Sequence, residues 1–169
     1  EISSRWGRVP AFLSEDQGGS DDTEYALFSA TLLLAKRREL TSADVAQAWR
    51  KDIIKSDNAY KGAGFSGMIA IANLSNGLQP PQSGQHLHSW SDGLAMRVAP
   101  FGIASVGDPL LAAYLTKING EVSNSGEGIY SGQAVAAAIS VAMTGASLEL
   151  IIQAALNVIP KDSWTYSSI

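Results

Sequence analysis

The sequence contains no cysteine, so neither a disulfide framework nor a thiolate metal site can form part of its fold. It has only two histidines, His86 and His88, too few nitrogen ligands for a zinc site of the usual kind. Charged residues make up only 17%, and acidic residues outnumber basic ones by 16 to 12. The net charge of −4 gives no general electrostatic reason to bind nucleic acid.

Long apolar runs are missing as well. Residues 134–159 are nearly uncharged, but Thr144–Ser147 interrupts them and Glu149 follows, so no stretch of about 20 apolar residues survives. The first residues of the chain lack the apolar core of a signal peptide. We therefore expect a cytoplasmic protein without a membrane-spanning segment.

The chain of 169 residues, 46% of them hydrophobic, is long enough to bury the core of one domain, which we place at residues 1–169. The alternation typical of strands is hard to find, whereas helical signals recur along the chain. Tyr25, Phe28 and Leu32 share one face of a helix that is predicted to end near Arg38. This pattern predicts an all-α fold.

Other helices carry clear start signals. Thr41 with Asp44 matches a capping box, and the helix that it begins has Trp49 on its apolar face. Asp108 and Pro109 match an N-cap followed by proline at the first helical position. Further helices are predicted over roughly 67–75, 127–143 and 147–158, with a long polar loop over 77–95.

The most informative stretch is Ser20-Asp21-Asp22-Thr23, which places two adjacent carboxylates between two hydroxyl side chains. Oxygen donors at this density suit a hard divalent cation such as Mg²⁺ or Mn²⁺. The same residues also suit an ordinary helix start, because serine and aspartate are favoured N-caps and acidic residues complement the helix dipole. The tetrapeptide alone leaves both interpretations open.

Two later segments favour the metal-site interpretation when they are read together with the first. One is Ser91–Ile103, which contains Asp92-Gly93-Leu94-Ala95-Met96-Arg97, and the other is Val122–Tyr130. In this order and at these separations, the three segments resemble the ADP-ribosylglycohydrolase family. That family includes the dinitrogenase-reductase-activating glycohydrolases, the ADP-ribosylarginine and ADP-ribosylserine hydrolases, and the J-type crystallins. The resemblance covers most of the chain.

The resemblance implies a single orthogonal helical bundle around a two-metal centre. Ser20, Asp21 and Asp22 would then hold Mg²⁺ or Mn²⁺, with Asp22 also acting in catalysis. Glu1 would be what remains of a glutamate in the family's first helix and would act as a general acid or base. The family's second acidic motif, Asp-x-Asp-Thr, has no counterpart in this sequence. We therefore expect the domain without its first helix and its C-terminal acidic motif, and a further segment or a second chain would complete the metal site.

The resemblance also implies the substrate-binding residues. Backbone amides of the glycine-rich segment would approach ADP-ribose, and Leu94 would narrow the pocket where relatives carry a smaller residue. Arg97 is open to two interpretations, a ligand contact or an intramolecular ion pair. Asn124 stands where many relatives carry a histidine that contacts the substrate. The full set implied is Asp92, Gly93, Leu94, Ala95, Met96, Arg97, Asn124 and Gly128.

By resemblance, the reaction is hydrolysis of the glycosidic bond between ADP-ribose and a modified protein side chain. The expected partners are ADP-ribose or an ADP-ribosylated protein, with neither nucleic acid nor membrane. Two alternatives stay open at this point. One is a hydrolase that acts on another riboside in small-molecule metabolism, and the other is a non-catalytic relative that binds ADP-ribose or has a structural role.

Overall fold

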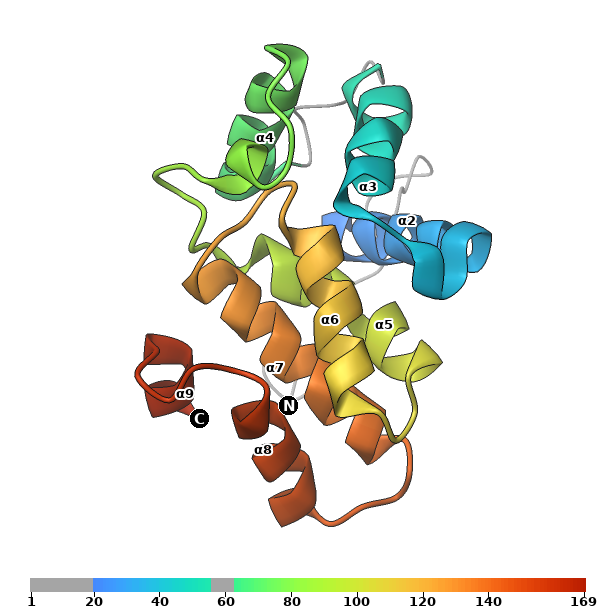
Figure 1. Ribbon diagram of the computed structural model, residues 1–169, viewed down its shortest axis with the longest axis vertical. Coiled ribbons are helices and arrows are strands. Elements are labelled where there is room, and N and C mark those ends of the chain that lie inside the picture. Colours follow the sequence, from blue (N-terminus) through green and yellow to red (C-terminus); the bar gives the residue numbers. More distant parts are fainter. Residues whose placement is uncertain (1–19, 56–62) are drawn as a thin grey trace, which may run out of the picture.

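The computed structural model describes residues 20–55 and 63–169, and every regular element within these ranges is helical (Figure 1). The predicted all-α fold is therefore confirmed. In chain order the elements are α2 (Asp21–Lys36), η1 (Arg37–Glu39), α3 (Ser42–Ala48), η2 (Trp49–Ile54), α4 (Phe65–Ser75), η3 (Gln82–Gly84), η4 (Asp92–Arg97), α5 (Ala99–Ala104), α6 (Pro109–Gly120), α7 (Glu127–Ala142), α8 (Leu148–Asn157) and α9 (Trp164–Ser168).

The predicted start signals begin helices as expected. The Ser20 hydroxyl accepts a hydrogen bond from a backbone N–H in the first turn of α2, at 3.3 Å. Thr41 and Asp44 form the reciprocal capping box of α3. The Asp108 carboxylate caps α6, with Pro109 at its first position. Each cap satisfies a backbone donor that the helix itself leaves without a partner.

Helix α7 is the centre of the fold, because it packs against α5, α6, α8 and η4. Figure 1 shows α6 and α7 side by side in the middle of the molecule, with α8 below them. Small residues make this close packing possible. A Cβ on Gly102 of α5 would lie 2.7 Å from the backbone oxygen of Ala136 in α7, so these two helices touch through their backbones.

The main core lies between α2, α3, η2, α4, η4, α5, α6 and α7, and its largest fully buried side chains include Trp49 and Phe101. A smaller apolar cluster, formed by Ala134, Ala155 and Ile159, joins α7 to α8 and the chain after it. Because α2 packs against η4, the first turn of α2 is brought to a segment far along the chain. Within the two described ranges, no helix combines the length and the apolar character needed to cross a membrane.

Several features differ from the predicted elements, among them α5, which was not predicted, and the π-helical geometry of η2. The region expected as one loop over 77–95 contains η3 and runs into the 3-10 helix η4. Helix α9 was not predicted; Ser163 caps it locally, and a tertiary contact also holds it. The Glu127 carboxylate at the start of α7 accepts hydrogen bonds from the backbone N–H groups of Trp164 and Thr165, at 3.0 and 2.9 Å. No local pattern in the sequence reveals such a contact.

Candidate functional site

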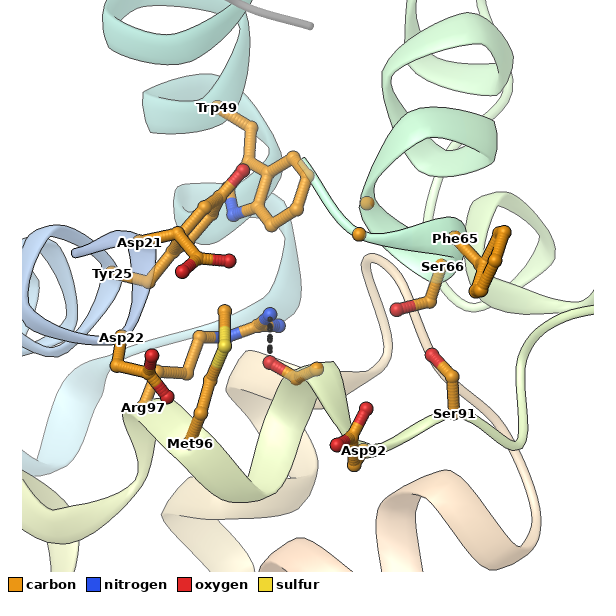
Figure 2. Close-up of a pocket in the computed structure, with 13 residues that line it drawn as sticks. Asp21, Asp22, Tyr25, Trp49, Phe65, Ser66, Ser91, Asp92, Met96 and Arg97 are labelled. Carbon is orange, nitrogen blue, oxygen red and sulfur yellow. Dashed lines mark hydrogen bonds between the residues drawn. The ribbon is translucent and has the colours of Figure 1, made fainter. Parts of the chain in front are cut away.

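A pocket of about 340 Å³ lies where the first turn of α2 faces η4 and the start of α4. Figure 2 shows residues of α2 on one side of this pocket, residues of α4 on the other, and the segment Ser91–Arg97 between them. The lining residues are Asp21, Asp22, Tyr25, Trp49, Gly64, Phe65, Ser66, Gly67, Ser91, Asp92, Gly93, Met96 and Arg97. The structure thus brings two of the three predicted sequence segments to one site.

The α2 side of the pocket is acidic. Asp21 is half-buried and Asp22 is exposed, and both carboxylates belong to the first turn of the helix. One turn further on, burial raises the pKa of the Tyr25 phenol, Arg97 lowers it, and the negative charges of Asp21 and Glu24 raise it further. The net effect is a raised pKa, so Tyr25 is a neutral hydrogen-bonding group at physiological pH.

The opposite wall is shaped by the geometry of η4. A 3-10 helix has about three residues per turn, so residues three apart share a face. Gly93 and Met96 line the pocket, whereas Leu94 is buried on the other face, and the buried Arg97 reaches the pocket only at its edge. The space above Gly93 is small, because a Cβ at that position would lie 2.8 Å from the Ser66 hydroxyl oxygen of α4.

Leu94 points away from the pocket. Its side chain is fully buried, and a Cβ added to Gly120 of α6 or Gly132 of α7 would collide with it. The prediction that Leu94 narrows the pocket is therefore wrong, because this leucine fills space between α6 and α7 instead. Ala95, the next residue, is half-buried and does not line the pocket either.

Arg97 is 2% exposed, and its guanidinium reaches the edge of the pocket. The dashed line in Figure 2 marks its hydrogen bond to the Gly93 carbonyl, 3.0 Å long. Of the two predicted interpretations, the ion pair is not observed, since no described carboxylate lies within ion-pairing distance of Arg97. Burial lowers the pKa of Arg97 to about 10, whereas the Tyr25 phenolate would raise it, so the side chain is a cation at neutral pH.

Asn124 and Gly128 lie behind the pocket wall and do not line it. The Asn124 side chain is 1% exposed and donates hydrogen bonds to the carbonyl oxygens of Ser89 and Ser91, at 3.1 and 2.9 Å. A Cβ on Gly128 would collide with the Ser89 carbonyl oxygen and lie 2.8 Å from the Asn124 amide nitrogen. In this structure both residues therefore support the segment that carries Asp92.

The oxygen donors that the described residues bring to the pocket supply only part of the ligand set that the expected Mg²⁺ or Mn²⁺ would need. Asp21 and Asp22 are ligands of the type that Mg²⁺ or Mn²⁺ prefers, and Asp92 faces the same pocket. The described residues nevertheless contain no group of three or more His, Cys, Asp or Glu side chains that could hold a metal ion. Ser20 is exposed, caps α2 and does not line the pocket. Glu1, the predicted acid or base, lies outside the described residues.

Seven residues that line the pocket were not identified as site residues from the sequence: Tyr25, Trp49, Gly64, Phe65, Ser66, Gly67 and Ser91. Trp49 was assigned to an apolar helix face, and that assignment is correct because the side chain is fully buried, yet one edge of it closes the pocket. Phe65 stands out only in the structure: it is 68% exposed although it is a large apolar residue, and it stacks on His88 with ring centroids 5.2 Å apart.

Comparison with known proteins gives one match. The model of a protein family described as ADP-ribosylglycohydrolase matches residues 2–169, which is nearly the whole chain. No match was found among curated proteins or among solved structures.

Proposed function

The chain belongs to the ADP-ribosylglycohydrolase family, and on that premise we propose that it is a metal-dependent hydrolase that cleaves the bond between ADP-ribose and a modified protein side chain. The family assignment by itself supports a glycohydrolase-type function. The observation that carries the finer proposal is the pocket, in which Asp21 and Asp22 face Asp92 and Gly93 from a distant part of the chain. Two statements go beyond the family assignment and are proposed here: that the substrate is a modified protein, and that the activity requires a metal ion.

The chemistry proposed for the chain's own residues follows from their types. The carboxylates of Asp21 and Asp22 accept hydrogen bonds from the hydroxyl groups of a ribose. As water adds to C1 of the ribose and the bond from C1 to the modified side chain breaks, Asp22 accepts the proton of the water and passes it to the departing side-chain atom. Beside Gly93, a backbone amide can approach a ligand oxygen because no Cβ stands in the way. Cleavage of a glycosidic bond develops positive charge on the sugar, which nearby carboxylates stabilise.

Mg²⁺ or Mn²⁺, when bound, would supply Lewis-acid stabilisation and orient the water. Asp21 and Asp22 would hold the ion from the α2 side. Because the described residues provide only part of a donor set, we expect further oxygen ligands from a segment or a second chain outside the described ranges.

The proposal is tested by hydrolysis of peptides that carry ADP-ribose on arginine or on serine, with Mg²⁺ and with a chelator. Asp21→Asn and Asp22→Asn should each lower turnover at least about tenfold, because each removes a charged donor from the pocket. Glu24→Gln is the matched control: Glu24 is an exposed acid of the same helical turn that does not line the pocket. Equal turnover in all four proteins, or turnover that is unaffected by chelation, contradicts the proposal.

A second candidate is a non-catalytic protein that binds ADP-ribose. The partial donor set favours it, since a metal held by too few ligands would not be retained. Calorimetric titration with ADP-ribose beside the hydrolysis assay separates the two functions, because this candidate predicts binding of ADP-ribose to the full-length protein without turnover of either peptide.

A further inference from the structure

Arg97 is a buried cation in an unusual setting. It is 2% exposed, and the described residues place no carboxylate within ion-pairing distance of it. Its guanidinium carbon instead lies 5.8 Å from the ring centre of Tyr25 and 5.4 Å from that of Trp49. Aromatic faces attract a cation, but burying a charge without a counter-ion is costly. Hydrogen bonds therefore have to hold this side chain.

Those hydrogen bonds reach three separate parts of the chain. The arginine donates from Nη1 to the Gly93 carbonyl at 3.0 Å, from Nε to Asn119 Oδ1 at 2.9 Å, and from Nη2 to Ser123 Oγ at 2.8 Å. Asn119 lies in α6, and its own amide nitrogen is buried without a partner, so the bond to Arg97 accounts for its orientation. The guanidinium thus joins η4 to the end of α6 and to the chain after it.

The contact with Ser123 continues as a relay with a fixed direction. A guanidinium can only donate, so the Ser123 oxygen accepts from it and its O–H donates onward to Asn124 Oδ1, at 2.7 Å. The Asn124 Nδ2 group then faces the carbonyl oxygens of Ser89 and Ser91 and donates to both. A flipped amide would place its oxygen against those two carbonyl oxygens, which is repulsive.

We propose that Arg97 is the positioning residue of this site and that, through Ser123 and Asn124, it fixes the wall formed by Ser91, Asp92 and Gly93. It holds Gly93 directly at one end of this wall, and through the relay it holds the carbonyl groups of Ser89 and Ser91 at the other. The role in ligand binding rests on the proposed function, whereas the role in holding the wall does not.

The test compares two buried serines in the full-length protein. Ser123→Ala breaks the relay at a residue that does not itself line the pocket, by removing the oxygen to which Arg97 donates. Ser140→Ala is the control, because Ser140 is equally buried and its hydroxyl donates one hydrogen bond, to the Ser105 carbonyl at 2.6 Å, away from the pocket. A general loss of stability would appear in both variants. Arg97→Lys, which keeps the charge but cannot reach three acceptors, should behave like Ser123→Ala.

Two readouts are needed. In Ser123→Ala, the backbone amides of residues 89–97 should exchange with deuterium faster than in wild type, and the affinity for ADP-ribose measured by calorimetry should fall about tenfold. Ser140→Ala should change neither quantity. Exchange in residues 89–97 that is equal in the two serine variants overturns the positioning role. If wild type itself fails to bind ADP-ribose, the proposed function fails, and the exchange comparison still decides whether the relay holds the wall.

Discussion

Leu94 belongs to a segment that was predicted to bind the substrate, but its side chain is part of the hydrophobic core. It fills the space that Gly120 and Gly132 leave between α6 and α7. Leu94→Ala should therefore lower the free energy of unfolding by about 2–5 kcal/mol, the cost of a large-to-small change in a packed core. Urea denaturation measures this effect. Leu34→Ala removes the same atoms from a side chain that is 81% exposed, and it should change stability by less than about 0.5 kcal/mol. Equal losses in the two variants would contradict the assignment of Leu94 to the core.

His86 makes stability depend on pH. Burial lowers the pKa of His86 from 6.5 more than the Ser123 carbonyl raises it, and the charge of His88 lowers it further. Its ring Nδ1 accepts a hydrogen bond from the His88 backbone N–H, which protonation would remove. Because the unfolded chain binds this proton more readily, the stabilising contribution is complete above pH 6.5 and is lost as the pH falls through the lower value of the folded state.

The expected result is a decrease in the free energy of unfolding between pH 7.5 and pH 5.5, smaller in His86→Gln than in wild type. Urea denaturation at the two pH values measures both decreases. The His86 assignment is wrong if the variant loses as much stability on acidification as wild type does.

Single residues also mark what the sequence could predict about the site. Asp21, Asp22, Asp92 and Gly93 were predicted as site residues from their motifs, and they do line one pocket. The direction of a side chain within η4 was not predictable, because it depends on whether the backbone forms a loop or a 3-10 turn. Because the backbone forms a 3-10 helix, Leu94 is buried in the core while its neighbour Gly93 lines the pocket.

At the scale of elements, α9 depends on a contact with α7. Five residues are too few to form a stable helix alone, so the bonds from Glu127 add to the local cap that Ser163 provides. Burial raises the pKa of Glu127, but hydrogen bonds from Thr165 and Trp164 together outweigh it and leave the pKa below its ordinary value. The ionised form therefore holds α9, and this contribution is lost as the pH falls below 4.5 through the folded-state value.

Glu127→Gln should accordingly release α9. The backbone amides of Trp164 and Thr165 should exchange with deuterium faster than in wild type, while those of α6 keep their protection. Glu149→Gln is the control, because Glu149 is an exposed acid in the first turn of α8. Unchanged exchange at Trp164 in Glu127→Gln would show that the carboxylate does not hold the helix.

The contrast between elements follows from how they are stabilised. Helices α3 and α6 were predictable because Thr41 and Asp108 cap them through local hydrogen bonds. Helix α9 also has a local cap, Ser163, which was missed from the sequence, whereas η4 is held by contacts with distant residues such as Ser123. A local helix cap can be recognised from a short residue pattern in the sequence, whereas a contact with a distant residue cannot.

For the molecule as a whole, the arrangement around α7 explains why an all-α chain places distant motifs at one pocket. Helix α7 packs against η4, and η4 in turn packs against α2, so Asp21 and Asp22 come to lie opposite Asp92. The periodicity of the sequence predicted the helices but not this order of packing. Only the family resemblance indicated that the two segments share a site.

The central claim is that Asp22 and Gly93 belong to one binding site for ADP-ribose, and calorimetric titration of the full-length protein with ADP-ribose in the presence of Mg²⁺ tests it most directly. Gly93→Val should weaken binding at least about tenfold, because a side chain there obstructs the approach of a ligand oxygen to the backbone. Asp22→Asn should weaken it to a similar extent through the loss of a charged oxygen donor. Wild-type affinity in both variants, with wild-type thermal stability, would contradict the account.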